Sequence, residues 1–444
     1  MAISQFPVAL QPIIQQNFLQ RLFWEGLQSN LGYRAVAETI VFPNNIGETF
    51  TSTKRSSLSP ALDPLAPASN TGLDNGLTPV QWAVEQFTLS LSVYANTMDL
   101  DIFQQHIGIV ERFTVNAVAL AEMARKQRDR LAYRAIMDAY MSGNTTVTTT
   151  LGSPGTTLAV DDIRGFRNVI VGGIQTAVGV SNTLAITVNG VAAVVIGATA
   201  DVTNVSSVAA FGGISGTLTT QANVSVANGT AGNIVASFDR PTVLRANDRT
   251  KTASLVATDY LTMNVIIDAV SELRSNNVPT INGAYNLYLN EKQINGLFRD
   301  ADFRQWHQGL ASGNVDYSKG VVNDLLGVRI IRTTEGNVQV TSGVPRGVQR
   351  AVLCGAGALY EADYAGTMAY VRSLGEVEDD ANIDVVDGVV FVTREPLDRL
   401  KHRITQSYFF ATGFVAPTDV LTTSALIPTA SAARYKRAVV IESA

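Results

Sequence analysis

The spacing of apolar residues changes from a helical period to a strand period near Ser142. Upstream of that point, apolar residues recur at steps of three, four or seven: Val110, Phe113, Ala117, Leu120, Ala124, Leu131 and Ala135. No proline or glycine stands between Gly108 and Gly143. The pattern predicts one long amphipathic helix, roughly Asp101 to Ser142, within a segment of residues 96–143. At 1.5 Å per residue such a helix extends about 60 Å.

The stretch that follows has a strand pattern and almost no charge. Its only ionisable side chains between Asn144 and Phe238 are Asp161, Asp162, Arg164, Arg167 and Asp201. Two β-rich runs flank Asn189-Gly190, a dipeptide typical of a two-residue hairpin turn. Residues 144–248 are therefore predicted to form an inserted β-rich domain, a small sandwich or barrel.

The N-terminal third has the pattern of an arm and a long loop. A short helical stripe within residues 12–29 is predicted on an N-terminal arm, residues 1–34, although a core helix of the main domain stays open as an alternative. Residues 35–53 have an extended pattern, residues 56–79 are rich in Pro, Ser, Asn and Gly, and Val80 to Tyr94 alternates as a strand. We predict an extended two-limbed β-loop over residues 35–95, longer than ordinary connections within a compact domain.

The remainder mixes helices and strands. Helical periodicity covers Val256 to Arg274, and another helix is predicted to begin near Asn290. Strands are predicted at Tyr285–Leu289, Val328–Arg332, Ala351–Cys354, Gly388–Val392 and Ile404–Phe414. This order indicates an α+β class, not a regular βαβ repeat.

Composition points to partners that cover much of the surface. Only 16% of residues are charged, against about 25% in a typical soluble domain. The formal net charge of −5 gives no broad basic footprint for tight nucleic-acid binding. For the polar face of the long helix, a solvated face is favoured, with contact to nucleic acid as the alternative. No run approaches the length of a membrane span, and the start of the chain has no signal-peptide pattern.

Catalytic and metal sites find little support. The histidines His106, His307 and His402 are scattered, and Cys354, on an apolar strand, is expected to be a buried thiol. Gly355-Ala356-Gly357 lacks a dinucleotide fingerprint and is better explained by close backbone packing. The acidic run Glu376–Asp387 departs from a calcium loop, which leaves a solvated loop or a contact to a basic neighbour. No catalytic residue, cofactor or metal is expected.

The order of these parts resembles the major capsid protein of tailed bacteriophages, the Hong Kong 97 type fold. The segments FTLSLSVYANTMDLD (87–101) and YNLYLNEKQINGLFRDADF (285–303) are similar to those of one phage coat family. The resemblance implies a Hong Kong 97-like capsid fold with an inserted domain. Its expected parts are the N-terminal arm (1–34), the extended loop (35–95), the spine helix of a peripheral domain (96–143), the inserted domain (144–248), a peripheral-domain helix (249–279), an axial domain (280–387), and a return to the peripheral domain with the C-terminal segment (388–444).

The implied function is that of a structural, non-enzymatic subunit of an icosahedral virion capsid, built of hexamers and pentamers around double-stranded DNA and assembled in the host cytoplasm. Implied partners are further copies of the chain, a separate scaffolding protein, a portal, a decoration protein, and packaged DNA held by non-specific contact, with no membrane. The inserted domain is expected to project outward and contact neighbouring insertions or the decoration protein.

Inter-subunit contacts are expected at apolar and basic residues of the arm and loop: Phe18, Leu22, Phe23, Lys54, Arg55, Leu58, Leu62 and Leu65. Two rival classes stay open, an encapsulin-like nanocompartment shell protein and an adhesin-like surface structural protein. An enzyme is the least supported reading, because no nucleophile, base and orienting group can be assembled from these residues.

Overall fold

The computed structural model describes the chain in two compact units. Unit 1 comprises Met1–Phe50, Leu89–Ile136 and Leu359–Ala416, and unit 2 comprises Thr51–Thr88, Met137–Ala358 and Pro417–Ala444. The described residues are 23, 32–42, 49–55, 84–101, 109–171, 174–205, 214–310, 324–325, 327–334, 338–341, 344–364, 381–394, 399, 402–417, 419–421, 426–428 and 435–444.

Unit 1 is built on a six-stranded sheet. Its order is β1-β19-β22-β21-β20, with β4 paired to β22, and β1 runs parallel to β19. The strands are β1 (Ala37–Phe42), β4 (Ser92–Asp101), β19 (Leu359–Tyr364), β20 (Ala381–Val386), β21 (Val389–Arg394) and β22 (Arg403–Val415). Along β22, inward and outward residues alternate, as expected of a strand with one dry face. A short 3-10 helix, η2 (Tyr33–Val36), precedes β1.

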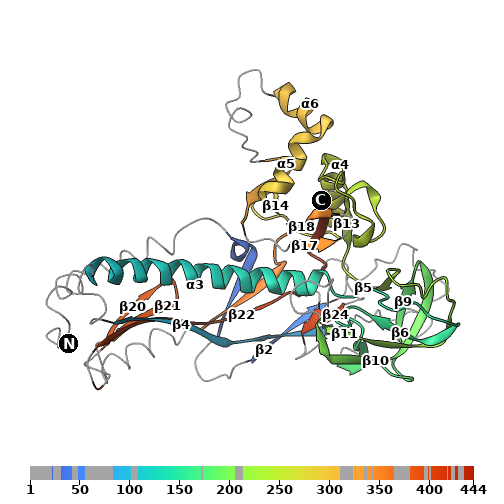
Figure 1. Ribbon diagram of the computed structural model, residues 1–444, viewed down its shortest axis with the longest axis horizontal. Helices are drawn as coiled ribbons and strands as arrows, with labels where there is room; N and C mark the ends of the chain where they lie inside the picture. Colours follow the sequence, from blue (N-terminus) through green and yellow to red (C-terminus); the bar gives the residue numbers. More distant parts are fainter. Residues whose placement is uncertain are drawn as a thin grey trace, which may run out of the picture. The chain divides into compact units, whose positions relative to one another are not determined.

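The long helix α3 (Ile109–Tyr140) covers the dry face of this sheet (Figure 1). Its 32 residues extend about 48 Å. The stripe predicted from the sequence is the buried one: Phe113, Ala117, Leu120 and Ala124 are fully buried in a core that includes Tyr408 and Phe410 of β22. The alanines bring the helix backbone close to the sheet.

The predicted start of this helix is wrong. Ser92–Asp101 forms strand β4, which pairs with β22 from Thr412↔Ser92 to Arg403↔Asp101. Leu100 is buried in the unit 1 core. Pairing with a long neighbouring strand outweighs the local helical signal of these residues, because strand propensity depends on tertiary context.

The two limbs of the predicted loop form a two-stranded sheet of β2 (Thr49–Arg55) and β3 (Val84–Ser90). The loop itself is shorter than predicted, because β1 and the first residues of β4, which fall within residues 35–95, belong to the unit 1 sheet. The predicted turn at residues 43–47 and the tip at residues 56–79 lie outside the described residues.

The predicted inserted domain is a β-barrel. Its sheet has the order β5-β12-β9-β10-β11-β6, and a bridge between Val147 and Val160 joins its two ends. The strands are β5 (Asn144–Thr146), β6 (Gly155–Val160), β9 (Leu184–Val188), β10 (Val191–Val205), β11 (Ile214–Val224) and β12 (Ile234–Ser237). A separate hairpin is formed by β7 (Asn168–Val171) and β8 (Ile174–Ala177). The barrel has its own core of buried side chains, among them Leu158, Ile186, Leu218 and Val235.

The predicted hairpin turn is confirmed at β9–β10. Val188 pairs with Val191, and the two residues between them, Asn189 and Gly190, have φ angles of 51° and 82°. Positive φ at both positions defines a type I′ turn, the geometry that asparagine and glycine favour.

Unit 2 also contains a seven-stranded sheet of order β13-β25-β18-β14-β16-β15, with β17 on β18. The strands are β13 (Val243–Arg245), β14 (Tyr285–Leu289), β15 (Asp324–Leu325), β16 (Val328–Arg332), β17 (Val338–Thr341), β18 (Val344–Cys354) and β25 (Ala438–Ser443). The helices are α4 (Met263–Ser275), α5 (Glu291–Arg299) and α6 (Ala301–Leu310), with 3-10 turns η5 (Ala246–Asp248) and η6 (Thr252–Ser254). Strands β23 (Asp419–Leu421) and β24 (Leu426–Pro428) pair with each other.

Several predicted domain boundaries do not coincide with the sheets that the strands and helices join. Helix α4 packs its buried stripe into the core of the unit 2 sheet, and the assignment of residues 249–279 to a peripheral domain stays a prediction. Strands β19 and β20, predicted as axial, pair within the unit 1 sheet, whereas β25, predicted as peripheral, lies in the unit 2 sheet. Strand β13, predicted inside the insertion, also joins the unit 2 sheet. The apolar pattern predicts each element and its dry face, but does not say which sheet the face meets.

Candidate functional site

Of the predicted contact residues, the structure describes the surroundings of one. Phe23 is fully buried, with its ring centroid 4.8 Å from that of Phe391, in the core of unit 1. Its predicted role in contact between subunits stays a prediction. Lys54 and Arg55 lie on strand β2, and Phe18, Leu22, Leu58, Leu62 and Leu65 lie outside the described residues.

Unit 1 contains a cluster of two arginines and two carboxylates. Arg34 of η2 donates from Nε to Glu361 on β19 at 2.8 Å and from Nη1 to Asp387 at 2.9 Å. Arg128 of α3 donates to the same two residues, to Glu361 at 3.3 Å and to the Asp387 backbone carbonyl at 2.9 Å. Asp387 lies in the tight turn between β20 and β21, where its φ is 49°. The four charges thus connect η2, α3, β19 and the β20–β21 turn.

The charges of this cluster pair with one another, which fits a structural role. Burial lowers the pKa of the Arg128 guanidinium, and the neighbouring charge of Arg34 lowers it further against the effect of Glu361. For Arg34, burial is opposed by Glu361 and Asp387, and the net effect raises its pKa. Arginine stays protonated in either case. Both carboxylates accept from guanidinium groups, which leaves no free general base in the cluster.

A second buried cluster surrounds Glu442 on β25. This carboxylate is fully buried and accepts hydrogen bonds from Arg245 Nε at 2.8 Å, Arg350 Nε at 3.0 Å and Thr252 Oγ1 at 2.7 Å. Burial alone raises the pKa of Glu442, but the charges of Arg350 and Arg245 and the hydrogen bonds outweigh it, and the net pKa is lowered. The strand register places Arg245 on β13 and Arg350 on β18 directly opposite Glu442, one on each side.

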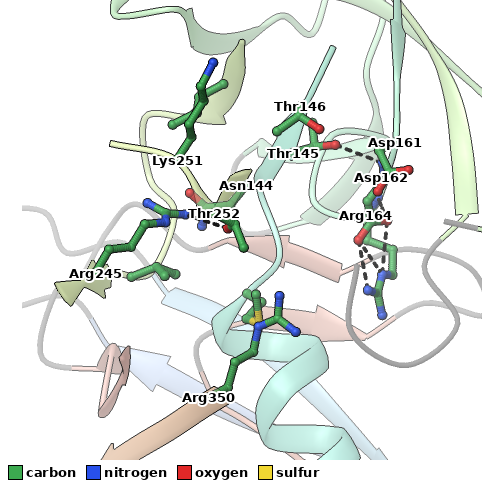
Figure 2. A pocket seen from close by; sticks show the side chains of 13 residues that line it. Asn144, Thr145, Thr146, Asp161, Asp162, Arg164, Arg245, Lys251, Thr252 and Arg350 are labelled. Carbon is green, nitrogen blue, oxygen red and sulfur yellow. Dashed lines mark hydrogen bonds and ion pairs between the residues drawn. The ribbon is translucent and has the colours of Figure 1, made fainter. Parts of the chain in front are cut away.

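A small polar cleft lies between the barrel and the unit 2 sheet (Figure 2). It has a volume of about 40 Å³. Its lining residues are Met141, Asn144, Thr145, Thr146, Asp161, Asp162, Arg164, Ile234, Val243, Arg245, Lys251, Thr252 and Arg350. Since one water needs about 10–15 Å³ of such a volume, the cleft has room for about three waters.

Arg164 is the best-fixed side chain of this cleft. It donates from Nη1 to Asp138 at 2.5 Å and from Nη2 to Asp162 at 2.9 Å, and the Asp162 backbone N–H donates to Thr145 Oγ1 at 2.8 Å. Asp162 and Arg164 are two of the five ionisable residues between Asn144 and Phe238. They serve to hold the first strand of the barrel against the last turn of α3.

A larger open cleft of about 510 Å³ lies beside α5. It is lined by Ala257, Tyr260, Lys292, Asn295, Gly296, Arg299, Val344 and Ala444. The Arg299 guanidinium lies 4.7 Å from the centroid of the Tyr260 ring, a cation–π contact. This set of residues contains neither a histidine nor a serine, cysteine or carboxylate side chain with which a nucleophile and base pair could be built.

The remaining candidates from the sequence have structural roles. Cys354 is fully buried on β18, and burial raises the pKa of its thiol far above the ordinary range, so the reactive thiolate is disfavoured. A Cβ added to Gly355 would lie 2.3 Å from Val278 Cγ1, which confirms the interpretation of close packing. Asn382 and Asp384 lie on the regular strand β20, and no group of three or more His, Cys, Asp or Glu side chains suited to a metal ion occurs in the described part of the chain. Within that part, no helix is both long and apolar enough to cross a membrane.

Sequence reasoning missed the buried charge clusters. Glu442 stands alone among apolar residues in the strand AVVIES, as Arg350 does among the residues that follow it in β18. A single charge within an apolar strand was the available signal, because such a residue is rarely buried unless it is paired. The partners could not be read from the chain, since Arg245 and Glu442 are separated by 197 positions.

No family model matches this chain, and no curated protein matches it. Among solved structures, it is similar to bacteriophage capsids. The capsid of Ralstonia phage GP4 is 11% identical, with 95% of this chain and 90% of that chain covered and a TM-score of 0.47. The acidic stable capsid structure of Helicobacter pylori bacteriophage KHP30 is 10% identical, with 94% and 92% covered and a TM-score of 0.45. The capsid of Cyanophage P-SCSP1u is 10% identical, with 92% and 86% covered and a TM-score of 0.43.

Because these identities are about 10% and the TM-scores are below 0.5, the function must be inferred from this chain's own features.

Proposed function

We propose that this chain is the major structural subunit of a tailed-bacteriophage capsid and assembles with further copies of itself into a closed shell. The shell would consist of hexamers and pentamers and enclose double-stranded DNA. The proposed role is mechanical and not catalytic, and the two clefts described above fit it, since one has room for about three waters and the other lacks a nucleophile and base pair.

The observation that carries the proposal is the two-stranded sheet of β2 and β3. Two strands alone are marginally stable in water, so the pair needs support from other surfaces. Part of that support comes from this chain, since Phe87 and Leu89 on β3 are buried. On β2, Thr49, Phe50, Thr51 and Thr53 are exposed, and Phe50 keeps 37% of its surface accessible. An exposed limb of this kind is suited to contact with an adjacent subunit.

Unit 1 has a rigid core of its own. Helix α3 and the six-stranded sheet share one core, and the Arg34, Arg128, Glu361 and Asp387 cluster fixes four of its elements together. Exposed apolar side chains also occur on this unit, with Val93 on β4 at 71% and Val41 on β1 at 57%. A low charge content together with exposed valines fits a surface that other subunits cover.

The barrel is proposed to contact neighbouring barrels or a decoration protein. With Asp162 and Arg164 engaged beside the cleft, most of its surface is uncharged, and Val180 and Val191 are 80% and 52% exposed. Replacing residues 144–238 with a short linker tests this role: shells of lower thermal stability support it, and shells of unchanged stability exclude it.

The proposal as a whole is tested by substituting Phe50. The Phe50→Asp variant should remain folded by circular dichroism and fail to form closed shells in electron micrographs, whereas the matched Phe50→Leu variant should form them. Normal shells from Phe50→Asp would remove the two-stranded sheet of β2 and β3 from the assembly mechanism. A nanocompartment shell protein is the remaining alternative, and shells that enclose protein cargo instead of DNA would favour it.

The accessory partners are part of the same proposal. A separate scaffolding protein would set the curvature during assembly in the host cytoplasm, a portal would occupy one vertex, and DNA would be held without sequence preference. Many weak contacts per subunit then add to a stable container, because each arm makes attachment multivalent.

A further inference from the structure

Strand β4 lies at an edge of the unit 1 sheet. In the described part of the chain it pairs with β22 alone, along its whole length of 10 residues. Its side chains are largely exposed, among them Ala95, Thr97 and Val93, which keeps 71% of its surface accessible. Because an edge strand presents a row of backbone N–H and C=O groups, it can pair with a further strand.

The strand register shows which backbone groups of β4 point away from β22. The two-residue turn between β20 and β21 makes Val386 and Val389 a hydrogen-bonded pair, and such pairs alternate along antiparallel strands. Followed through the registers of β21 and β22, this alternation bonds the even-numbered residues of β4 to β22. The backbone groups of Val93, Ala95 and Thr97 therefore point outward.

The backbone N–H of Thr97 agrees with this direction. It donates to Oδ1 of the exposed Asn96 side chain at 2.9 Å, so it is satisfied by a side chain of its own strand. Local bonds of this kind satisfy a backbone donor that has no neighbouring strand. A strand that pairs with β4 would replace this one bond with a bond of the sheet.

The first part of this edge also lacks the features that keep edge strands apart. The stretch Ser92–Met98, called the β4 edge below, contains no charged residue, proline or glycine. Charged side chains and prolines are usual means by which edge strands avoid pairing. The strands at the other two edges have such charges, since β1 has the exposed Glu38, and Asp384 of β20 lies opposite the buried Phe391 and so faces the dry side of the sheet.

We propose that the β4 edge pairs with the β4 edge of a second copy of this chain, in antiparallel orientation about a two-fold axis at Ala95. A second copy matches this edge because each outward N–H of one strand then meets an outward C=O of the other, and no charges are brought together. The inference rests on the proposed function, of which it names one contact between subunits.

The side chains place the axis at Ala95. With the axis there, Val93 lies opposite Thr97 of the second copy, and two β-branched side chains form a favourable cross-strand pair. The apolar surface of Val93, exposed in the single chain, is then covered. An axis at Asn96 would instead place Val93 opposite the carboxylate of Asp99.

Disulfide formation tests both the pairing and its register. The only native cysteine, Cys354, is fully buried, so a cysteine introduced on β4 is the one that reacts. In the full-length chain, Ala95→Cys would place two Cα atoms about 5.5 Å apart across the axis, a distance that a disulfide spans. After mild oxidation, non-reducing electrophoresis should show most of this variant at twice the 47.4 kDa of the single chain.

The neighbouring positions supply matched controls. Val93→Cys should stay a single chain on the same gel, because the two copies of residue 93 would lie about 14 Å apart along the strands. The double variant Val93→Cys, Thr97→Cys should cross-link, because its cysteines lie opposite each other. Equal cross-linking of Ala95→Cys and Val93→Cys overturns the proposal, as does the absence of cross-linking from both Ala95→Cys and the double variant.

Charge at the axis gives a second, independent measurement. Ala95→Lys and Ala95→Glu each place two like charges directly opposite each other, which destabilises a strand pair. Dissociated subunits of either variant should therefore lose the dimer that the unaltered chain and Ala95→Thr show in sedimentation, and an equimolar mixture of the two should regain it. Dimers that persist in Ala95→Lys alone would overturn the pairing.

Electron microscopy of the same preparations keeps this result apart from the proposed function. If the unaltered chain forms shells and Ala95→Cys cross-links within them, both inferences stand. If Ala95→Cys forms shells and stays a single chain on the oxidised gel, another surface covers the β4 edge and only the pairing is overturned. If Ala95→Cys cross-links and the unaltered chain forms no shells, only the shell proposal fails.

Discussion

Glu442 allows the buried electrostatics of unit 2 to be tested quantitatively. Its side chain is 0% exposed, and that of Arg350, its neighbour across β18, is 1% exposed. The change Glu442→Gln keeps the shape of the side chain but removes the carboxylate charge that pairs with the buried Arg350 guanidinium. Breaking a buried ion pair from one side costs about 3–5 kcal/mol, so the free energy of unfolding should fall by that amount.

The second cation modifies this expectation only slightly. The side chain of Arg245 is 14% exposed, so it can turn its guanidinium toward water after the substitution. The guanidinium of Arg350, whose side chain is 1% exposed, cannot turn toward water in this way. The double variant Glu442→Leu, Arg350→Met replaces the pair with apolar side chains, a change that is often neutral or stabilising. It should therefore be more stable than either single variant.

Urea denaturation of dissociated full-length subunits, followed by circular dichroism, gives the four free energies of this double-mutant cycle. A coupling energy of about 2–3 kcal/mol is expected for two contacting charges. The reasoning is refuted if Glu442→Gln costs less than about 1 kcal/mol, or if the two single changes add without coupling.

Three further predictions concern packing and pH. Phe23→Ala should lower the free energy of unfolding, measured by urea denaturation, by about 3–5 kcal/mol, because the substitution leaves a cavity at a fully buried aromatic side chain. A near-zero change in this free energy would place Phe23 outside the core. Gly413→Ala should destabilise unit 1 strongly, because the added Cβ would lie 1.8 Å from a backbone oxygen. Gly152→Ala is the control: a Cβ added at Gly152 has open space, so this variant should unfold at the same temperature as the unaltered chain. Equal calorimetric melting temperatures for the two variants would contradict the close approach at Gly413. The carboxyl groups of Glu442 and Asp259 have lowered pKa values in the folded chain, against ordinary values of 4.5 and 3.8. The stability that these two carboxylates contribute is therefore present above their ordinary pKa values and is lost as the pH falls below those values. A melting temperature of unit 2 that does not decline below about pH 4.5 would count against this prediction.

The sequence predicted the elements of the fold better than their partners. The helical stripe of α3, the β9–β10 turn and the capped start of α5 follow from local rules. Asn290 accepts a hydrogen bond from the Gln293 backbone N–H at 2.9 Å, as expected of a helix N-cap. These features depend on residues within a few positions of one another, and a single sequence contains the information for them.

Long-range pairing was the part that could not be predicted. Residues 96–101, predicted to begin the segment of the long helix, form the second part of strand β4 because β22, some 300 residues further on, pairs with them. In the same way, the apolar stripe of α4 indicates a buried face but does not distinguish one sheet from the other. The sequence likewise did not show that Phe23 is buried within its own chain, since an apolar residue in an arm can be buried there as readily as against a neighbour.

Assembly of the unaltered full-length chain tests the central claim most directly. Purified protein, concentrated alone and with its scaffolding protein, is imaged by electron microscopy and sized by sedimentation. The account predicts closed shells of uniform diameter that sediment far ahead of single subunits. A product that stays a 47.4 kDa monomer under all of these conditions would contradict it.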